Sequence, residues 1–206
     1  MSQTIEDFVN DLASDSPTPG GGSTAALVGA LSCALGEMVG NIRQEKVDKP
    51  HLANLLAEMT ASRNKMIALI KEDENSFAAF MQALKLPKET ETQKSIRASQ
   101  LLQGLISAAE PPLKIAQTAT MILHQLEEMK EYSSKSLLSD IGSGTALAEG
   151  ALKSSVLNVY ENTRMMKDKD KAAELDQLTN AVLNEGLEVS GRLYPAMTKA
   201  VRGEEQ

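Results

Sequence analysis

Apolar residues recur every three or four positions along most of the chain, the spacing that gathers side chains on one face of an α-helix. Residues 4–14 carry the first such stripe and predict a short amphipathic helix. A second helix is expected from about Ser23 to Gln44. Because its first half is apolar on nearly all sides, we expect it to be central and buried. Pro50 can serve as the first residue of a third helix, which should end before Leu86-Pro87-Lys88.

The predicted third helix carries a seam of apolar residues at alternating 3–4 spacing, over about five heptads. The seam comprises Leu52, Leu55, Met59, Met66, Leu69, Phe80 and Leu84. Its register also includes Ser62, Asp73 and Ser76. An ionised Asp73 on this buried seam costs free energy unless it is paired, hydrated or used in the protein's function. A helix break or local exposure would instead put it in water, and both interpretations stay open.

The second half of the chain continues the helical pattern, with prolines and polar connectors between segments. Pro111-Pro112 are expected to break or sharply kink the path. The predicted segments are residues 89–108, a helix ending near Met129, a connector at 133–136, and helices over about 137–165 and 168–200. No β pattern competes, so the sequence predicts an all-α bundle of long, mostly antiparallel helices in one domain, 1–206.

Composition agrees with helices and narrows the function classes. Aromatic residues make up 3% of the 206 residues and Trp is absent, which is typical of a helical rather than a sheet protein. The net charge of −7 disfavours nucleic-acid binding. The N-terminus lacks a signal-peptide pattern, and the longest uncharged stretch is too polar for a membrane span. We therefore expect a cytoplasmic, soluble protein with neither a nucleic-acid nor a membrane partner.

The candidate metal ligands are few and scattered. Cys33 is the single cysteine, which excludes an intrachain disulfide, and its apolar neighbours indicate a core residue. His51 and His124 are far apart in sequence and lack companion ligands. We interpret both as structural or solvated, and we expect no metal site.

A Pro/Gly segment precedes the second helix. Pro17 and Pro19 stiffen it, and Gly20, Gly21 and Gly22 allow backbone angles that a Cβ forbids. Ser23 stands where an N-cap is expected. The free N–H groups of a helix start can bind an anion or a ligand carbonyl. The segment lacks the Lys-Ser/Thr ending of a P-loop and no strand precedes it, which argues against a nucleotide-binding fold.

One face of the predicted helix over 137–165 combines polar and small residues. Its members are Asp140, Gly144, Leu147, Ala151, Ser155, Asn158 and Asn162. One carboxylate and two amides beside small residues leave room for a flat ligand. The alternative is a polar helix–helix contact satisfied by internal hydrogen bonds.

Taken together, these segments resemble the formiminotetrahydrofolate cyclodeaminase / methenyltetrahydrofolate cyclohydrolase family. Pro17–Ser23 and the Ala/Gly-rich helix after it are similar to the family's opening motif. Three later segments agree in order: Glu72–Phe77 leading to Leu86-Pro87-Lys88, Pro112-Leu113 with Ile115-Ala116, and Ser139-Asp140 with Asn158-Val159 and Asn162. The chain departs from the pattern at Pro111 and in a glycine-rich run at 141–145.

The resemblance implies an all-α homodimer that acts on a tetrahydrofolate derivative. The cyclodeaminase converts 5-formimidoyltetrahydrofolate to 5,10-methenyltetrahydrofolate and ammonia. The cyclohydrolase interconverts the methenyl and 10-formyl forms with water. Both reactions pass through a tetrahedral carbon between N5 and N10, and we expect no cofactor beyond the tetrahydrofolate substrate. The cyclodeaminase is the first hypothesis. A non-catalytic folate-binding bundle and a plain helical interaction module are the alternatives from other classes.

The cyclodeaminase chemistry needs a group that takes a proton from N10 and gives one to the departing amine. A partly desolvated carboxylate suits this, and either Asp73 or Asp140 is expected to supply it. The predicted substrate-binding residues are Gly20, Gly21, Gly22, Ser23, Ser139, Asn158 and Asn162. The anionic glutamate tail needs a cation, for which the candidates are Arg43, Lys88 and Lys135.

Overall fold

The computed structural model describes residues 3–44 and 50–204, and these residues form helices without a strand. The elements are α1 (Ile5–Leu12), α2 (Gly21–Gln44), α3 (Pro50–Leu84), α4 (Glu91–Lys130), a 3₁₀ turn (Lys135–Leu137), α5 (Leu138–Met165) and α6 (Lys169–Arg202). The all-α prediction is confirmed. The predicted start and end of the third helix are also confirmed, since α3 begins at Pro50 and ends at Leu84.

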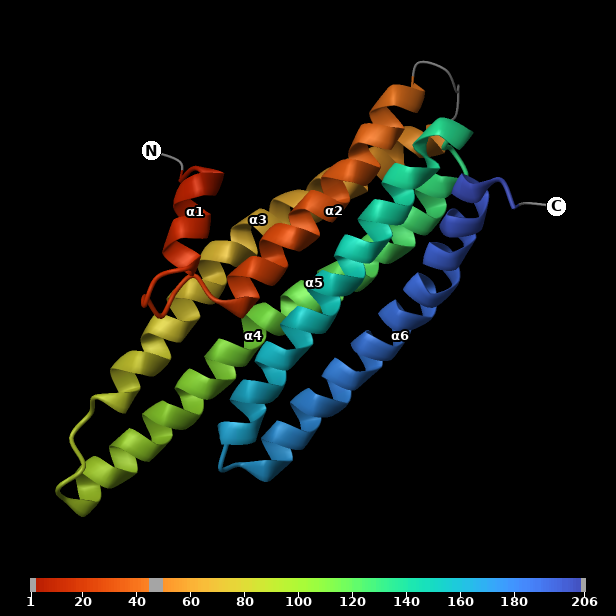
Figure 1. Cartoon of the computed structure of the whole chain (residues 1–206). Helices are drawn as coiled ribbons and strands as arrows, with labels where there is room; N and C mark the ends of the chain where they lie inside the picture. Colours follow the sequence, from red (N-terminus) through yellow and green to blue (C-terminus); the bar gives the residue numbers. More distant parts are fainter. Residues whose placement is uncertain (1–2, 45–49, 205–206) are drawn as a thin grey trace.

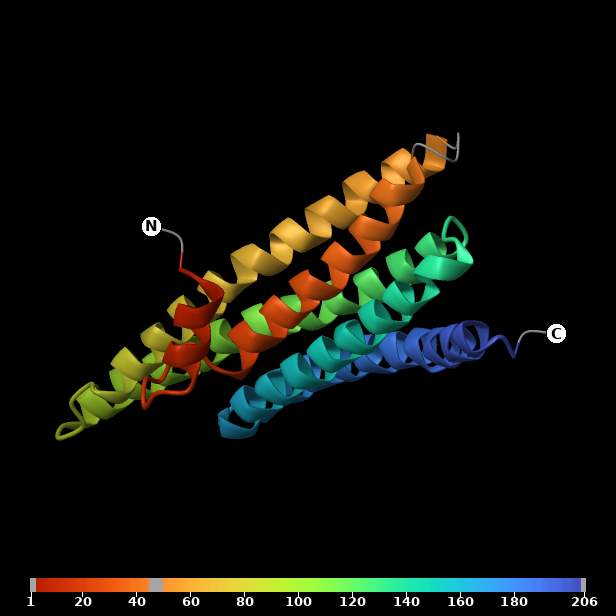
Figure 2. The same cartoon turned by 45° about the horizontal axis from the view of Figure 1, so that its top comes forward.

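The five long helices run up and down, each antiparallel to the next, while short α1 lies beside the start of α2 (Figure 1). Helix α5 is central and packs against α2, α4 and α6. The α3–α4 hairpin extends beyond the turn between α5 and α6 in both views (Figures 1 and 2). One end of the bundle is therefore a two-helix projection with less covering than the middle.

Two clusters of apolar side chains form the core. The larger one joins α2 to all the other long helices, with Leu126, Met129 and Leu152 fully buried. The smaller one lies towards the projecting hairpin and includes Phe80 and Leu105. The seam predicted on the third helix is confirmed from its start as far as Phe80, whereas Leu84 is 40% exposed. The seam therefore reaches water at the tip of the projecting hairpin.

Small residues let α2 approach its neighbours closely, as its sequence predicts. A Cβ on Gly40 would stand 2.6 Å from Cδ2 of Leu56, and one on Gly36 would overlap the Met59 side chain. Helix α2 is buried where it faces the bundle, as expected, but not on every side. Its outer face leaves Leu31 49% and Ile42 42% exposed. By length and hydropathy α2 is the one described helix that could span a membrane, but 56% of its most apolar window is buried, as in a core helix.

The predicted break at the two prolines is wrong, because α4 continues through Pro111 and Pro112. Proline has no N–H, so Pro112 leaves the carbonyl of Ala108, four residues earlier, without its helical donor. The side chain of Asn162 in α5 supplies the missing donor, with Nδ2 3.2 Å from the Ala108 oxygen. A polar residue of the neighbouring helix thus stabilises the proline site.

Candidate active site

Helix α2 begins two residues earlier than the sequence predicts. The N–H of Thr24 donates to the Gly20 carbonyl at 3.0 Å, so the helix starts at Gly21 and Ser23 lies inside its first turn. The N-cap prediction for Ser23 is therefore wrong. Gly20, Gly21 and Gly22 have ordinary backbone angles, because Gly203 alone among the described residues has a positive φ. The glycines are needed here for a reason other than backbone freedom.

That reason is the close approach of polar side chains from α3 and α5. A Cβ on Gly22 would overlap the carboxylate of Asp73, and one on Gly21 would lie 2.9 Å from Nδ2 of Asn158. Gly20 meets only an ordinary contact with the backbone. The first turn of α2 thus brings one carboxylate and one amide, 85 residues apart in sequence, against the same stretch of backbone.

Asp73 is the acid of this arrangement. The hydroxyl of fully buried Ser23 donates to Oδ2 of Asp73 at 2.9 Å, and the Asp73 side chain is only partly exposed. Burial raises the pKa of Asp73 above its ordinary value of 3.8, and the charge of Glu74 adds to the rise, while the Ser23 hydrogen bond opposes it. An aspartate with a raised pKa can accept and return a proton nearer to neutral pH.

Asn158 and Asn162 use their side-chain N–H groups in hydrogen bonds, which leaves their side-chain oxygens free to accept. Nδ2 of Asn158 donates to the Ser154 carbonyl at 2.8 Å, and Nδ2 of Asn162 donates to the Asn158 carbonyl at 2.8 Å. Within the described residues, neither side-chain oxygen accepts a hydrogen bond from another side chain or from the backbone. This face of α5 therefore offers two oriented acceptors. We call Gly21, Gly22, Ser23, Asp73, Asn158 and Asn162 the Asp73 cluster.

Asp140 and Ser139 lie on α5 but outside the Asp73 cluster. Asp140 precedes Asn158 by 18 residues, which at about 1.5 Å per residue is about 27 Å along the helix. The Ser32 hydroxyl donates to the Gly144 carbonyl at 2.7 Å, which fixes that end of α5 beside the middle of α2. Asp73 is therefore the carboxylate beside the first turn of α2, and one chain does not bring Asp140 to it.

The cations suggested for an anionic tail are also separated. Arg43, in the last turn of α2, donates from Nε to the Tyr132 carbonyl at 2.8 Å, and Lys135 follows in the 3₁₀ turn. Both lie at the end of the bundle remote from Asp73. Lys88 lies in the connection from α3 to α4. This connection is at the end of the bundle where α2 begins (Figure 1). Helix α3 runs 11 residues, about 16 Å, beyond Asp73 before this connection begins, so none of the three cations lies at the Asp73 cluster.

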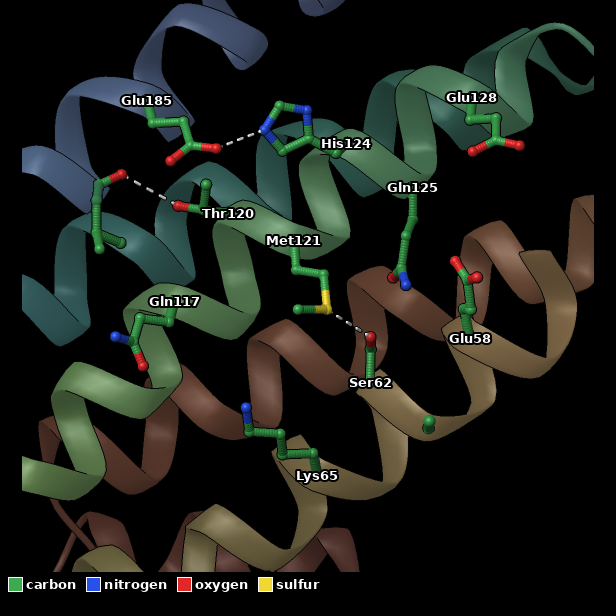
Figure 3. Close-up of a pocket in the computed structure, with 12 residues that line it drawn as sticks. Glu58, Ser62, Lys65, Gln117, Thr120, Met121, His124, Gln125, Glu128 and Glu185 are labelled. Carbon is green, nitrogen blue, oxygen red and sulfur yellow. Dashed lines mark hydrogen bonds and ion pairs between the residues drawn. The ribbon is translucent and has the colours of Figure 1, made fainter. Parts of the chain in front are cut away.

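A separate hollow, which we call the polar groove, lies between α3, α4 and α6 and has a volume of about 770 Å³ (Figure 3). Ten labelled residues line it: Glu58, Ser62, Lys65, Gln117, Thr120, Met121, His124, Gln125, Glu128 and Glu185. His124 is exposed and its Nε2 lies 2.9 Å from Oε1 of Glu185. Oε1 of buried Gln125 has no hydrogen-bond partner. None of the predicted site residues lines this groove.

Metal ligands do not cluster in the described residues, where no three His, Cys, Asp or Glu side chains could hold one ion. Cys33 is buried, as predicted, with its thiol 2.9 Å from the Met59 carbonyl. Burial and the charge of Glu37 raise the pKa of this thiol to about 12, which leaves it unreactive.

The chain is similar to several known proteins. The family model described as formiminotransferase-cyclodeaminase matches residues 4–181. A methenyltetrahydrofolate cyclohydrolase from Methylorubrum extorquens is 31% identical over 97% of this chain and 98% of its own length. The formimidoyltransferase-cyclodeaminase of Mus musculus is 33% identical over 82% of this chain, but the match spans only 32% of that longer protein. The crystal structure of a formiminotetrahydrofolate cyclodeaminase from Thermotoga maritima matches with a TM-score of 0.81 at 26% identity, over 98% of this chain and 96% of that one.

Proposed function

Because the chain belongs to the formiminotransferase-cyclodeaminase family, we propose that it is an enzyme of folate one-carbon metabolism that cyclises 5-formimidoyltetrahydrofolate to 5,10-methenyltetrahydrofolate with release of ammonia. The observation that carries this proposal is the Ser23–Asp73 pair: a partly buried carboxylate with a raised pKa, held at 2.9 Å by a buried hydroxyl. Cyclisation needs such a group, because a proton must leave one nitrogen and reach another.

In the proposed mechanism, Asp73 begins ionised. N10 attacks the carbon of the protonated formimidoyl group, the exocyclic C=NH2⁺ bond becomes single, and the N10 proton passes to the Asp73 carboxylate. The tetrahedral carbon now bears N5, N10 and an amino group. Asp73 then returns the proton to the amino nitrogen, the C–N bond breaks and ammonia leaves. The carbon is left bridging N5 and N10 as the methenyl cation, and Asp73 is ionised again.

The rest of the Asp73 cluster supports this by orientation. The free side-chain oxygens of Asn158 and Asn162 suit N–H donors, which the pterin ring and the amino group of the tetrahedral carbon both carry. The first turn of α2 presents N–H groups to a carbonyl of the ligand. The reaction itself needs neither a metal nor a nucleotide, since the tetrahydrofolate substrate carries the one-carbon unit.

The second candidate function is the methenyltetrahydrofolate cyclohydrolase reaction. The observation that favours it is the relative from M. extorquens, which carries that name and matches this chain almost from end to end. The same carboxylate would serve, because a proton must leave the water that attacks the methenyl carbon, and the ring nitrogen that is released must gain one. The two functions differ in the group exchanged, water or ammonia.

Side-by-side turnover distinguishes these functions. Methenyltetrahydrofolate absorbs in the near ultraviolet, so purified protein with 5-formimidoyltetrahydrofolate should accelerate the rise of that absorbance and release one ammonia per molecule formed. Rapid decay of added methenyltetrahydrofolate without that acceleration would assign the cyclohydrolase instead. Tight folate binding without either reaction would leave a non-catalytic binding bundle.

We also propose that the enzyme is a homodimer that pairs through the outer face of α2. Support comes from exposed Leu31, Met38 and Ile42, which share this face and would be covered by a second copy. Light scattering on the wild type and on Leu31→Asp tests this. A dimeric wild type with a monomeric, folded variant is expected, whereas a variant that stays dimeric would place the interface elsewhere.

A further inference from the structure

Pro111 and Pro112 lie side by side inside α4, and each removes one N–H from the helix. Pro111 leaves the carbonyl of Ser107, four residues earlier, without its helical donor. Ser107 is exposed, so water can donate to this carbonyl instead. Pro112 has the same effect on Ala108, which is only 5% exposed. The Ala108 carbonyl therefore depends on a donor from the protein.

That donor is a member of the Asp73 cluster. Nδ2 of Asn162 lies 3.2 Å from the Ala108 oxygen and 2.8 Å from the Asn158 oxygen, so each of its two hydrogens has a carbonyl to donate to. Within the described part of the chain, no side chain donates in this way to the Ser107 carbonyl. Of the two prolines, Pro112 is thus the one whose missing N–H is replaced by a residue of the proposed site.

The two hydrogen bonds fix which way the Asn162 amide faces. If the amide turned over, Oδ1, which can only accept, would lie against two carbonyl oxygens, and both hydrogen bonds would be lost. Nδ2 is therefore held by α4 and α5, while Oδ1 stays free on a half-buried side chain. Asn158, by contrast, donates only within its own helix, to the Ser154 carbonyl. The bond to Ala108 is thus the contact through which α4 orients an amide of the cluster.

We propose that Pro112 is a positioning residue for the reaction: because it has no N–H, the Ala108 carbonyl accepts from Asn162, and this keeps Asn162 Oδ1 free for the ligand. The inference rests on the proposed function, in which that oxygen accepts from an N–H group of the substrate or of the tetrahedral intermediate. An alanine at position 112 would supply a helix N–H that draws the Ala108 carbonyl towards the axis of α4. The Asn162 amide would then turn over more often, and its oxygen would no longer be in place to accept.

The test compares Pro112→Ala with Pro111→Ala, a matched control one residue earlier. Both variants lose a buried proline ring and gain one helix N–H, but only Pro112→Ala adds a donor to the carbonyl that Asn162 uses. Initial rates of folate turnover give kcat/KM for the wild type, both variants, Asn162→Ala, and the double variant of Pro112→Ala with Asn162→Ala. Without any substrate, NMR measures how fast the side-chain amide protons of Asn162 exchange with water, and their signals are those that disappear in Asn162→Ala. Circular dichroism checks that each variant is folded.

We expect Pro112→Ala to lower kcat/KM about three- to tenfold and to speed amide exchange at Asn162 about tenfold, because one of its two hydrogen bonds is weakened. Pro111→Ala should change neither quantity. In the Asn162→Ala background, Pro112→Ala should cause no further loss, since a residue that acts through Asn162 has no effect once that amide is absent.

Four outcomes would overturn the inference while turnover remains. They are an unchanged kcat/KM in Pro112→Ala, an unchanged exchange rate of Asn162 in that variant, the same effects in Pro111→Ala, and equal losses with and without the Asn162 amide. If the wild type turns over neither folate, the proposed function fails, and the exchange rates still decide whether Pro112 orients Asn162.

Discussion

The polar groove of Figure 3 and the Asp73 cluster both gather polar side chains from several helices, but they differ in how water reaches their acids. Glu58, Glu128 and Glu185 line a wide, open groove and are all exposed. Asp73 instead lies against the backbone of α2, where a buried hydroxyl holds one of its oxygens. Burial raises the pKa of Asp73 towards the range useful for proton transfer. The large volume of the polar groove does not by itself shift the pKa of an exposed carboxylate.

The two regions also differ in what builds them. The cluster depends on two glycines whose missing Cβ atoms admit side chains from other helices. The groove is lined by long, exposed side chains. Its buried polar atom without a hydrogen-bond partner is the amide oxygen of Gln125. Chemistry in this bundle is therefore expected where helices come closest together.

The largest contrast is expected from removing one acid in each region. Asp73→Asn should lower kcat about 10²- to 10⁴-fold because it removes the proposed proton carrier. Glu128→Gln, in the groove, should leave kcat within twofold. Initial rates of methenyltetrahydrofolate formation measure both. Full activity in Asp73→Asn would remove this residue from the mechanism.

Asp73→Asn should also stabilise the protein at neutral pH. The folded-state pKa of Asp73 lies above its unfolded value of 3.8, so its contribution to stability is present below that value and is lost as the pH rises through the folded pKa. The ionised group thus costs stability near pH 7, and the amide does not. We expect the variant to raise Tm by about 2–4 °C at neutral pH, which corresponds to a gain of about 1 kcal/mol in the free energy of unfolding. Near pH 4 the rise in Tm should be smaller. Thermal unfolding at both pH values measures this, and an equal shift at both would contradict it.

A methyl group at Gly22 should disturb the cluster, whereas one at Gly150 should not. The added Cβ of Gly22→Ala overlaps the Asp73 carboxylate, so we expect a loss of about 1–3 kcal/mol in the free energy of unfolding and of most activity. Gly150 lies inside α5 with open space around it, and Gly150→Ala should gain about 0.5–1 kcal/mol with activity retained. Urea unfolding and initial rates compare the pair. Similar behaviour of the two variants would show that contact at Gly22 is unimportant.

The Ser23 hydroxyl should affect the pH at which kcat/KM falls on the acid side of the pH–rate profile. Its hydrogen bond lowers the pKa of Asp73, so Ser23→Ala should raise that pKa further. Since the ionised carboxylate accepts the N10 proton, activity falls as the pH drops through this pKa. The midpoint of kcat/KM should therefore move to higher pH in Ser23→Ala. If the midpoint does not move, the fall in kcat/KM at low pH belongs to the titration of another group.

The smallest effect is expected in the polar groove. Gln125→Leu removes a buried amide oxygen that lacks a partner, so the free energy of unfolding should rise by about 1 kcal/mol or less. Turnover should not change, because Gln125 lines the polar groove and does not belong to the Asp73 cluster. A substantial loss of activity would show that the groove takes part in the reaction.

The helices themselves could be predicted because periodicity is a local property of the sequence. The seam of α3, its start at Pro50 and its end before Leu86-Pro87-Lys88 all follow from residues within a few turns of one another. The sequence also brought Ser23, Asp73 and Asn158 into one hypothesis, but through motif resemblance rather than through any measure of distance.

Tertiary contacts decided the rest. Local propensity places a break at Pro111 and Pro112, but Asn162 of another helix satisfies the carbonyl that Pro112 leaves free. A helical wheel gives the angle of a residue around the axis and not its height, so Asp140 shares a face with Asn158 yet lies about 27 Å away. The glycines before Ser23 suggest unusual backbone angles, whereas Gly21 admits the Asn158 side chain and Gly22 admits that of Asp73. The sequence by itself thus determined the helices and the residue types of the site, and only packing decided which carboxylate is desolvated, because burial depends on neighbours far away in the chain.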